Sequence, residues 1–265
     1  MKHCAVIGNP IAHSLSPKIH QHFAKAHQIS LQYQTILATS DTFSEEVADF
    51  FEQQGLGMNV TLPFKQQAFE LADRVTPRAE LAQSVNTLSL INGRLVGDTT
   101  DGAGFITDLD RLKAPYKNAN IIILGAGGAA RSLIPPLLQH GAQIRLVNRT
   151  RANADRLIER FAAVGDIHYF EPNFRPHLVI NTLPQNGSAC LQSLTLGQLP
   201  QVTFYDISYG ERAAEFLNFV KQQGAKFCFD GWGMLVEQAA LSFALWHQVQ
   251  PNTDALISAY PGSLK

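Results

Sequence analysis

The first hundred residues alternate between apolar patterns typical of strands and of helices. Residues 4–7 form an apolar run and residues 31–37 repeat apolar side chains with period two, so both predict strands. Residues 43–51 carry phenylalanine and valine at helical spacing, and Gly55 is a natural end for that helix. Ser16-Pro17 places a capping hydroxyl before a proline, which predicts the start of a helix between the two strands.

The pattern continues with a third strand and a hairpin. Residues 58–62 are predicted to form a strand that Pro63 stops, and Thr76-Pro77 repeats the hydroxyl-proline start of a helix. Residues 86–96 are predicted to form a hairpin, because Asn92-Gly93 readily takes the positive φ angles of a type I′ turn.

The second half of the chain has the pattern of a parallel sheet. The apolar strand at 121–124 runs into a glycine-rich turn and a helix-length segment before the next strand at 143–147, which is a βαβ unit. Three further strands are predicted at 178–181, 203–207 and 225–229, with a helix at 211–223. Such a sheet is covered by helices on both faces.

The predicted fold class is α/β with two lobes. The first is an α/β substrate-binding domain with a mixed sheet, residues 1–101 plus 234–265, and the second is a Rossmann-like domain, residues 102–233. Helices are predicted at 234–249 and 251–260, and Pro135-Pro136 predict a kink in the helix after the glycine turn.

Composition limits the classes of function. Of the 265 residues 45% are hydrophobic and 16% charged, so the chain can form real cores. A net charge of -1 offers no basic surface for nucleic acid, and we expect a small-molecule partner. No signal peptide or membrane span is indicated, which favours the cytoplasm. The cysteines Cys4, Cys190 and Cys228 lie far apart, so neither disulfides nor a metal site are expected.

The turn Gly125-Ala-Gly-Gly-Ala-Ala130 matches the dinucleotide-binding pattern between a strand and a helix. There the backbone approaches a pyrophosphate and the helix dipole meets its charge, although glycines also occur simply for tight packing. The next strand ends in Asn148-Arg149-Thr150-Arg151 where an NAD enzyme usually has an acid. A guanidinium there favours NADP, unless it is a solvated surface arginine.

Two charged residues follow strand ends and are candidates for proton transfer. Lys65 closes the segment Asn59-Val-Thr-Leu-Pro-Phe-Lys65, and Asp101 lies in Gly97-Asp-Thr-Thr-Asp-Gly102. An ammonium held beside a carboxylate can protonate a ketone oxygen, but the spacing does not pair them and both could be surface charges. Ser14 and Ser16 could cradle a carboxylate at a helix start, while Ser16 is also explained as a cap.

Eight ordered segments together resemble the shikimate dehydrogenase family over nearly the whole chain. They are Gly8 to Pro17, Asn59 to Lys65, Val85-Asn-Thr87, Gly97 to Gly102, Gly125 to Arg131, Asn148-Arg-Thr150, Tyr205-Asp-Ile-Ser-Tyr209 and Asp230 to Gln238. The resemblance implies NADPH-dependent reduction of 3-dehydroshikimate to shikimate, on the route to chorismate and the aromatic amino acids. It also implies that the C-terminal helices return to the first lobe.

The resemblance also implies roles for individual residues. Lys65 with Asp101 would be catalytic; the substrate carboxylate would be held by Ser14, Ser16 and Tyr209, and the hydroxyls by Asn59, Thr61, Asn86, Asp101 and Gln238. The cofactor would be bound by Gly125, Ala126, Gly127, Gly128, Ala129, Asn148, Arg149 and Thr150, and its nicotinamide bordered by Ile207, Gly231 and Met234.

The chain departs from the family pattern at two places. The segment Asn181-Thr-Leu-Pro-Gln-Asn-Gly187 replaces Asn-Ala-Thr-Ser followed by glycine, and Asn153 replaces a second basic residue, for which Arg151 is the candidate substitute. The competing functions are a quinate/shikimate dehydrogenase with broader substrates and a non-catalytic NADP-sensing protein. The first would carry an acid near the cofactor ribose, and the second would lack Lys65 or Asp101. Either a monomer or a homodimer is compatible with the sequence.

Overall fold

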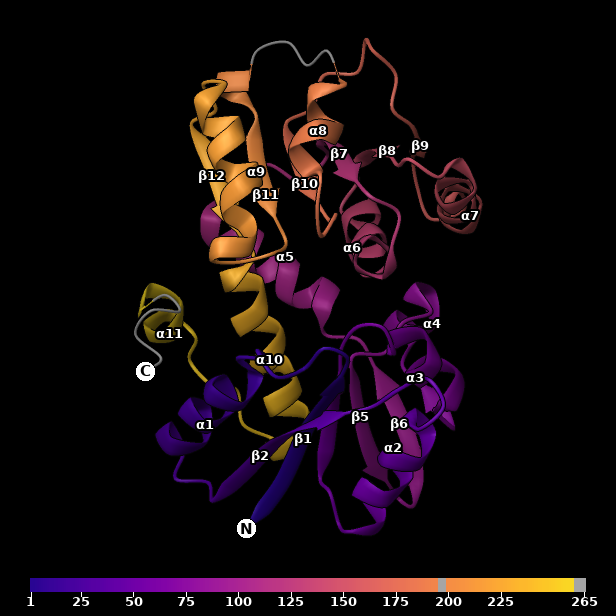
Figure 1. The fold of residues 1–265 in the computed structure, drawn as a ribbon, viewed down its shortest axis with the longest axis vertical. Coiled ribbons are helices and arrows are strands. Elements are labelled where there is room, and N and C mark those ends of the chain that lie inside the picture. The colour runs from indigo at the N-terminus through magenta and orange to yellow at the C-terminus, as the bar shows by residue number, and fades with distance from the viewer. Residues whose placement is uncertain (195–198, 260–265) are drawn as a thin grey trace. The chain divides into compact units, whose positions relative to one another are not determined.

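The computed structural model describes residues 1–194 and 199–259, and the chain divides into two compact units (Figure 1). Unit 1 contains Met1–Gly104 and the chain from Val236 onward, and unit 2 is Phe105–Leu235. Both boundaries fall inside helices, α5 (Asp101–Leu112) and α10 (Trp232–His247), whereas the sequence analysis placed them at 101/102 and 233/234. Residues 260–265 of the predicted domain, and Tyr260 of the predicted last helix, lie outside the described residues.

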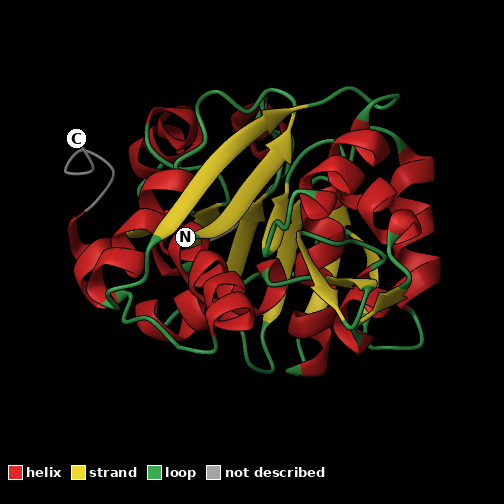
Figure 2. Ribbon diagram, turned by 90° about the horizontal axis from the view of Figure 1, so that it is seen from below, coloured by secondary structure: helices red, strands yellow, loops and turns green. Residues whose placement is uncertain are grey.

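Unit 1 is built on a mixed six-stranded sheet in the order β2-β1-β3-β5-β6-β4. The strands β1 and β3 are parallel, while β5 is antiparallel to both β3 and β6. Figure 2 shows β1 and β2 as two long neighbouring strands near the N-terminus. The strands are β1 (Lys2–Gly8), β2 (Leu31–Leu37), β3 (Gly57–Val60), β4 (Arg74–Val75), β5 (Thr87–Ile91) and β6 (Arg94–Asp98).

Helices cover both faces of this sheet. One core joins Ile7 and Met58 to the buried phenylalanines of α2 and to α3 and α4. On the other side Cys4 and Tyr33 pack with Trp246 of α10. The helices that lie wholly in unit 1 are α1 (Ser16–Ala26), α2 (Phe43–Glu52), α3 (Lys65–Leu71), α4 (Pro77–Ala82) and α11 (Asp254–Ala259). The predicted return of the C-terminal helices to the first lobe is therefore confirmed.

Unit 2 is a doubly covered parallel sheet in the order β12-β11-β10-β7-β8-β9. Apolar side chains alternate along β7, so that Ile121 and Ile123 face one core while Ile122 and Leu124 face the other. The strands are β7 (Asn120–Leu124), β8 (Gln143–Val147), β9 (Ile167–Tyr169), β10 (Leu178–Asn181), β11 (Thr203–Asp206) and β12 (Phe227–Asp230). This is the predicted Rossmann-like architecture.

The two cores of unit 2 define which helices lie on which face. Residues of α5, α6 and α7 contribute to the first core, and residues of α8 and α9 to the second. These helices are α6 (Gly128–Gln139), α7 (Arg151–Phe161), α8 (Gly187–Gln192) and α9 (Glu211–Gln222), with a 3-10 turn at Leu199–Gln201. The helix α6 runs through Pro135 and Pro136, and its first turn lies upstream of both.

Several local predictions need correction. The Ser16 hydroxyl does not cap α1, because the helix begins at Ser16 itself and Leu15 occupies the cap position. Leu37, the last residue of the period-two pattern, is 64% exposed at the end of the edge strand β2. The third strand ends at Val60 rather than residue 62, and α3 starts at Lys65 where no helix was predicted.

The hairpin and the second hydroxyl-proline start form as predicted. Asn92 and Gly93 have φ angles of 51° and 73°, as a type I′ turn requires. The Thr76 side chain accepts a hydrogen bond from the N–H of Ala79 and so caps α4. The order of strands in each unit thus places the ends of β3 and β6 beside the start of β5 in unit 1, and the ends of β7, β8 and β10 together in unit 2.

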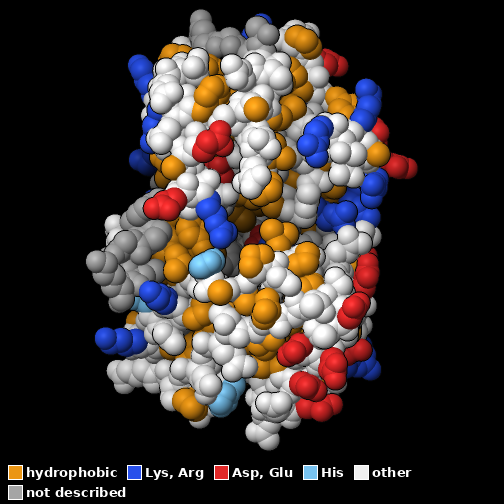
Figure 3. Space-filling view, in the orientation of Figure 1, with side chains coloured by type: hydrophobic (Ala, Val, Ile, Leu, Met, Phe, Trp, Pro, Cys, Tyr) orange, Lys and Arg blue, Asp and Glu red, His pale blue; other side chains and the backbone are white. Residues whose placement is uncertain are grey.

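The surface carries charges of both signs. On the face in Figure 3, acidic and basic side chains both occur over each unit, among hydrophobic and uncharged ones. Among the residues that the structure describes, no helix combines the length and the apolar composition that crossing a membrane requires.

Candidate active site

Lys65 and Asp101 form an ion pair at the strand ends of unit 1. Lys65 is the first residue of α3, after β3, and Asp101 is the first residue of α5, after β6. The Nζ of Lys65 lies 2.7 Å from Oδ2 of Asp101, and the two side chains are 19% and 8% exposed. The sheet brings together two charges whose spacing in the sequence did not pair them. An ammonium held in this way keeps solvent access for a proton-transfer partner.

Asn86 fixes the second oxygen of this carboxylate. The backbone N–H of Thr100 donates to Oδ1 of Asn86 at 2.8 Å, which assigns the two ends of the amide because an N–H can only donate. The Nδ2 of Asn86 then donates to Oδ1 of Asp101 at 2.9 Å and to Oε1 of Gln238 at 3.2 Å. Asn86 therefore contacts both Asp101 and Gln238, and all three are predicted to hold substrate hydroxyls.

Asn59 is held by a second group of polar side chains. Its Oδ1 accepts from the hydroxyl of Tyr33 at 2.8 Å, and its Nδ2 donates to the backbone oxygen of Asn86 at 3.1 Å and to Oγ of Ser242 at 3.0 Å. The amide of Asn59 is thus engaged at both ends inside the protein. Asn59 is also 6% exposed, so any substrate contact must compete with these partners.

The sequence predicts no role for four further residues of this network: Tyr33, Thr87, Thr100 and Ser242. Thr87 and Thr100 are the sequence neighbours of predicted site residues, and Ser242 lies one helical turn after Gln238. These positions are the only signals in the sequence that could have identified the three residues. Tyr33 appeared only as an apolar member of a strand pattern. Its hydroxyl nevertheless donates to Asn59, so this buried strand residue helps to orient a predicted site residue.

A close helix contact sets the position of Gln238. A Cβ atom added at Gly104 of α5 would lie 2.5 Å from the backbone nitrogen of Gln238 in α10. Only glycine permits this approach, because real Cβ atoms do not come that close to backbone. The contact brings the polar side of α10 against the segment that carries Thr100 and Asp101.

Ser14 and Ser16 lie at the start of α1, and Thr61 follows the end of β3. The Oγ of Ser14 accepts a hydrogen bond from the backbone N–H of Ser16 at 3.3 Å, so Ser14 satisfies the amide at the start of α1. Ser16 is buried, and Ser14 and Thr61 are half-buried. The N–H of Thr61 donates to the oxygen of Ile7, which extends the pairing of β1 and β3 beyond the end of β3.

A buried histidine packs against Tyr33, the residue that donates to Asn59. His20 is fully buried, and its ring stacks on Tyr33 with centroids 4.4 Å apart. Burial lowers the pKa of His20 to about 3, so the ring is neutral at physiological pH. Burial also raises the pKa of Tyr33 well above its ordinary value, which keeps the phenol protonated as a donor to Asn59.

In unit 2 the glycine turn connects β7 to α6. Gly125 has a φ of 106°, which favours glycine, and an added Cβ there would lie 2.5 Å from Oγ1 of Thr182. At Gly127 and Gly128 an added Cβ would meet nothing within 4 Å, so both are open to a neighbour from outside. No side chain caps α6, and its first N–H groups are available to an anion.

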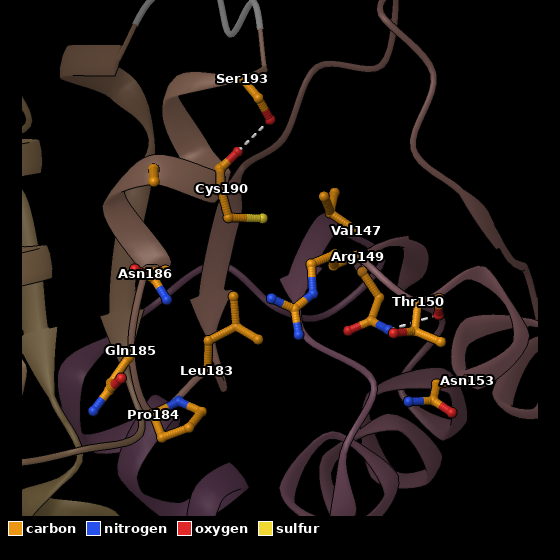
Figure 4. A pocket seen from close by; sticks show the side chains of 12 residues that line it. Val147, Arg149, Thr150, Asn153, Leu183, Pro184, Gln185, Asn186, Cys190 and Ser193 are labelled. Atoms are coloured by element: carbon orange, nitrogen blue, oxygen red, sulfur yellow. Dashed lines mark hydrogen bonds between the residues drawn. The ribbon is translucent and has the colours of Figure 1, made fainter.

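A cavity of about 760 Å³ lies at the end of β8 (Figure 4). One wall is the predicted segment Asn148, Arg149 and Thr150, and the opposite wall is formed by Leu183, Pro184, Gln185 and Asn186 with part of α8. In Figure 4 the side chain of Arg149 extends into the cavity, toward the segment around Leu183 and Cys190. Arg149 is exposed and makes no hydrogen bond or ion pair with the described residues.

The structure separates the remaining cofactor candidates from this cavity. Gly125 to Ala129 do not line it, although Leu183 of its wall lies 3.1 Å from the position of a Cβ on Gly125. Arg151 does not line it either: its guanidinium lies over the ring of Tyr169, 4.4 Å from the centroid. The segment 183–186 forms one wall of this cavity, but no role is predicted for its residues, because there the sequence departs from the family pattern.

Asp206 is connected to this wall through the side chain of Asn181. Its Oδ2 accepts from Nδ2 of Asn181 at 2.8 Å, and the Oδ1 of Asn181 accepts from the N–H of Leu183 at 3.1 Å. Burial raises the pKa of Asp206 to about 6, while the hydrogen bonds from Asn181 and Ser208 oppose the rise and the nearby Asp230 adds to it. With this pKa the carboxyl of Asp206 gains its proton as the pH falls just below neutral.

The other unit 2 candidates lie after β11 and β12. A Cβ on Gly231 would meet the backbone oxygen of Ile207 at 2.1 Å, so these two segments touch. Ile207 and Met234 pack against the first core of unit 2. The ring of Tyr209 lies 6.1 Å from that of Trp232, and burial raises the pKa of its phenol.

The residues of unit 2 fit a phosphorylated dinucleotide. The start of α6 behind two open glycines suits a pyrophosphate, and Arg149, which has no partner among the residues that the structure describes, suits an additional phosphate. The cavity is large enough for part of such a molecule.

Three family models match consecutive parts of the chain. The shikimate dehydrogenase substrate binding domain matches residues 6–88, shikimate / quinate 5-dehydrogenase matches residues 109–171, and the shikimate 5'-dehydrogenase C-terminal domain matches residues 231–259. Together these matches include parts of both units and of the helix that returns to unit 1.

Individual relatives agree with the family matches. The chain is 43% identical to a shikimate dehydrogenase (NADP(+)) of Buchnera aphidicola subsp. Schizaphis graminum, over 96% of this chain and 95% of the relative. It is 40% identical to one of Shewanella halifaxensis, over 96% and 93%. A crystal structure of shikimate 5-dehydrogenase from Thermus thermophilus in complex with NADP(H) and shikimate has a TM-score of 0.86, with 28% identity over 98% of each chain. The chain belongs to the shikimate dehydrogenase family.

Proposed function

We propose that this protein is a shikimate dehydrogenase that reversibly reduces 3-dehydroshikimate to shikimate with NADPH. The observation that carries the proposal is the Lys65–Asp101 ion pair, whose carboxylate is held by Asn86 beside Gln238, in a chain of this family. When bound, NADPH supplies the hydride that the ring carbonyl carbon receives. The protein must then supply a proton to the carbonyl oxygen.

Lys65 is the proposed proton donor. Its ammonium gives a proton to the oxygen as the C=O bond becomes C–OH, and in the reverse direction the neutral amine takes that proton back. Asp101 holds the ammonium in place through Oδ2 while its Oδ1 is bound by Asn86. The pair thus keeps a charged donor in one position at the strand ends of unit 1.

The remaining polar candidates are proposed to bind the substrate. Ser14, Ser16 and Tyr209 would hold the carboxylate, and Asn59, Thr61, Asn86, Asp101 and Gln238 the ring hydroxyls. The buried residues among them already hydrogen-bond to one another, so a polyol would meet donors and acceptors whose orientations are set in advance.

The cofactor is proposed to bind on unit 2. Gly125 to Ala129 would take the pyrophosphate at the start of α6, with Asn148, Arg149 and Thr150 at the adenosine phosphate and Ile207, Gly231 and Met234 beside the nicotinamide. Arg149 supports NADPH over NADH, because it extends into the cavity and has no hydrogen-bond or ion-pair partner in the described part of the chain. Arg151 is the weaker candidate, since it stacks on Tyr169.

The proposal is tested by following the oxidation of NADPH through the loss of absorbance of its reduced nicotinamide. Purified protein is mixed with 3-dehydroshikimate, and 3-dehydroquinate and NADH serve as controls. Turnover with 3-dehydroshikimate and NADPH that far exceeds both controls supports the assignment. Comparable turnover of 3-dehydroquinate would indicate a quinate/shikimate dehydrogenase, and binding of NADPH without turnover of either substrate would indicate an NADP-sensing protein.

The protein is further proposed to work in the cytoplasm as a monomer or homodimer. The support is that Cys4, Cys190 and Cys228 are all free thiols, which suits a reducing compartment. Cell fractionation and sedimentation of the purified protein test the two statements separately.

A further inference from the structure

Two hydroxyls that never reach the surface connect the polar residues of unit 1. Thr87 of β5 is 1% exposed and Ser242 of α10 is fully buried, and their oxygens lie 2.8 Å apart. Both oxygens are engaged by other side chains of the network, and we assign neither of them a contact with the substrate. Any influence of this hydroxyl pair, Thr87 and Ser242, on the reaction must therefore pass through other residues.

Ser242 joins α10 to three separate segments of the unit. Its Oγ accepts from Nδ2 of Asn59 at 3.0 Å and lies 3.2 Å from Oγ1 of Thr100 and 2.8 Å from that of Thr87. The backbone oxygen of Gln238, one turn earlier on the same helix, lies 3.1 Å from Oγ of Ser242 and is an alternative acceptor to Thr87 for the single proton of this hydroxyl. Ser242 thus fixes the helix that carries Gln238 against the strand ends.

Thr87 acts on the amide of Asn86. Its hydroxyl donates to Oδ1 of Asn86 at 2.9 Å, beside the N–H of Thr100 that donates to the same oxygen. Two donors at one end of the amide leave its Nδ2 pointing at Asp101 and Gln238. If the hydroxyl of Thr87 were lost, Oδ1 of Asn86 would keep the Thr100 N–H but lose part of what fixes its orientation.

We propose that Thr87 and Ser242 are positioning residues for the reaction, which set the orientation of Asn86 and the register of Gln238 against Asp101. The proposal rests on the function proposed above. On this view the hydroxyls of Thr87 and Ser242 affect the reaction rate. The alternative is that they only stabilise the fold. If the hydroxyls position Asn86 and Gln238, the reaction rate should fall when a hydrogen bond is removed. If they only stabilise the fold, the rate should depend on whether the buried volume is kept.

Thr87 offers a test in which the two roles predict opposite orders. Thr87→Val keeps the shape and removes the hydroxyl, whereas Thr87→Ser keeps the hydroxyl and removes a buried methyl group. We expect Thr87→Val to lower kcat/KM for 3-dehydroshikimate by about 5- to 50-fold, the range for an impaired buried hydrogen bond. Thr87→Ser should stay within about twofold of wild type, even though its melting temperature falls. The KM for NADPH should change in neither variant.

Thr99→Val is the matched control. Thr99 is also buried beside the network, and among the described residues its Oγ1 has no hydrogen-bond partner. Its kcat/KM should remain within about twofold of wild type, because the substitution removes a buried hydroxyl that orients nothing. Ser242→Ala provides a second variant, with an expected loss in the same range as Thr87→Val, if either variant at Thr87 fails to fold.

The outcomes separate this proposal from the one it rests on. Wild-type protein without activity on 3-dehydroshikimate would reject the proposed function itself. Active wild type with Thr87→Ser as impaired as Thr87→Val, or with Thr87→Val within twofold of wild type, would overturn the positioning role. A parallel rise in the KM for NADPH would assign the effect to general destabilisation and overturn it as well.

Discussion

The candidate residues of the two units differ in what they hold. In unit 1 they hold one another: Lys65 binds Asp101, Asn86 binds Asp101 and Gln238, and Asn59 binds Ser242. In unit 2 the candidates for the two phosphate contacts are open: Gly127 and Gly128 face open space, and Arg149 has no hydrogen-bond or ion-pair partner among the described residues. A small polyol needs several donors and acceptors set in advance, whereas a phosphate can be met by backbone N–H groups and one charge.

This difference predicts how substitutions should behave. In unit 1 a variant should change catalysis and stability together, because each side chain also serves its neighbours. In unit 2 a variant of an unpartnered residue should change affinity alone. The following experiments test this contrast.

The largest effect is expected at Lys65. We expect Lys65→Ala to reduce turnover by about 10²- to 10⁴-fold while substrate binding changes only a few fold, because the proton donor is lost and the hydroxyl-binding residues remain. Lys65→Arg is the control, since it keeps a positive charge beside Asp101 but does not release a proton near neutral pH. Steady-state kinetics and substrate binding measure both, and turnover within threefold of wild type would remove Lys65 from the mechanism.

Arg149 represents the opposite case. We expect Arg149→Ala to raise the KM for NADPH about 10- to 150-fold, as for a lost charge-assisted contact of ~1.5–3 kcal/mol, with little change for NADH. Its melting temperature should stay at the wild-type value, because the side chain has no hydrogen-bond or ion-pair partner among the described residues. Arg151→Ala, which removes the guanidinium over Tyr169, is the matched control. Equal effects of Arg149→Ala on both cofactors would contradict the assignment.

Asp206 is an exception within unit 2, because it supports the 183–186 wall through Asn181. Burial raises its pKa to about 6, against about 3.9 in an unfolded chain, so the folded state binds the extra proton between these values. Its contribution to stability should therefore fall as pH rises from about 4 to about 6 and level off above, by roughly 2–3 kcal/mol in total.

Comparison with Asp206→Asn isolates this titration. The free energy of unfolding in urea is measured for both proteins between pH 4 and pH 7, and the wild type should lose stability relative to the variant across the lower part of that range. Parallel curves would show that Asp206 does not titrate there.

The smallest effect is expected at Ser14. Its Oγ accepts from the N–H of Ser16, so Ser14→Ala should lower stability by about 0.5–2 kcal/mol and also weaken substrate binding. A substrate analogue with the carboxylate replaced by a hydroxymethyl group separates the two effects. It should lose little affinity on Ser14→Ala, and an equal loss for both ligands would place Ser14 away from the carboxylate.

The sequence predicted most of the fold because its elements have strong local signals. The hydroxyl-proline start at Thr76 and the Asn92-Gly93 turn need only their own neighbours, and both form as predicted. The start of α1 shows the limit: Ser16 matches the cap pattern, yet the amide there is satisfied by Ser14. Such a choice depends on how the preceding loop folds, which a local pattern does not contain.

The site was predicted unevenly for a similar reason. Motifs identified Lys65 and Asp101 as candidates, but their 2.7 Å contact depends on the order of β3, β5 and β6 in the sheet. Ser242 lies on a helix far along the chain and carries no motif of its own, so only the tertiary structure reveals its contacts with Asn59 and Thr87. The 183–186 wall was not assigned because there the chain departs from the family pattern.

The contact between Gly104 and the backbone of Gln238 has a consequence for mutational screens. A residue with any side chain at position 104 would push α10 away from α5, since even the first carbon would overlap the main chain. In a scan of all substitutions, Gly104 should tolerate fewer replacements than Thr87 or Ser14, each of which keeps its hydrogen bond when one hydroxyl residue replaces another. The least tolerant position near the site would then be one that carries no chemistry, and a ranking by tolerance alone would mistake it for a catalytic residue.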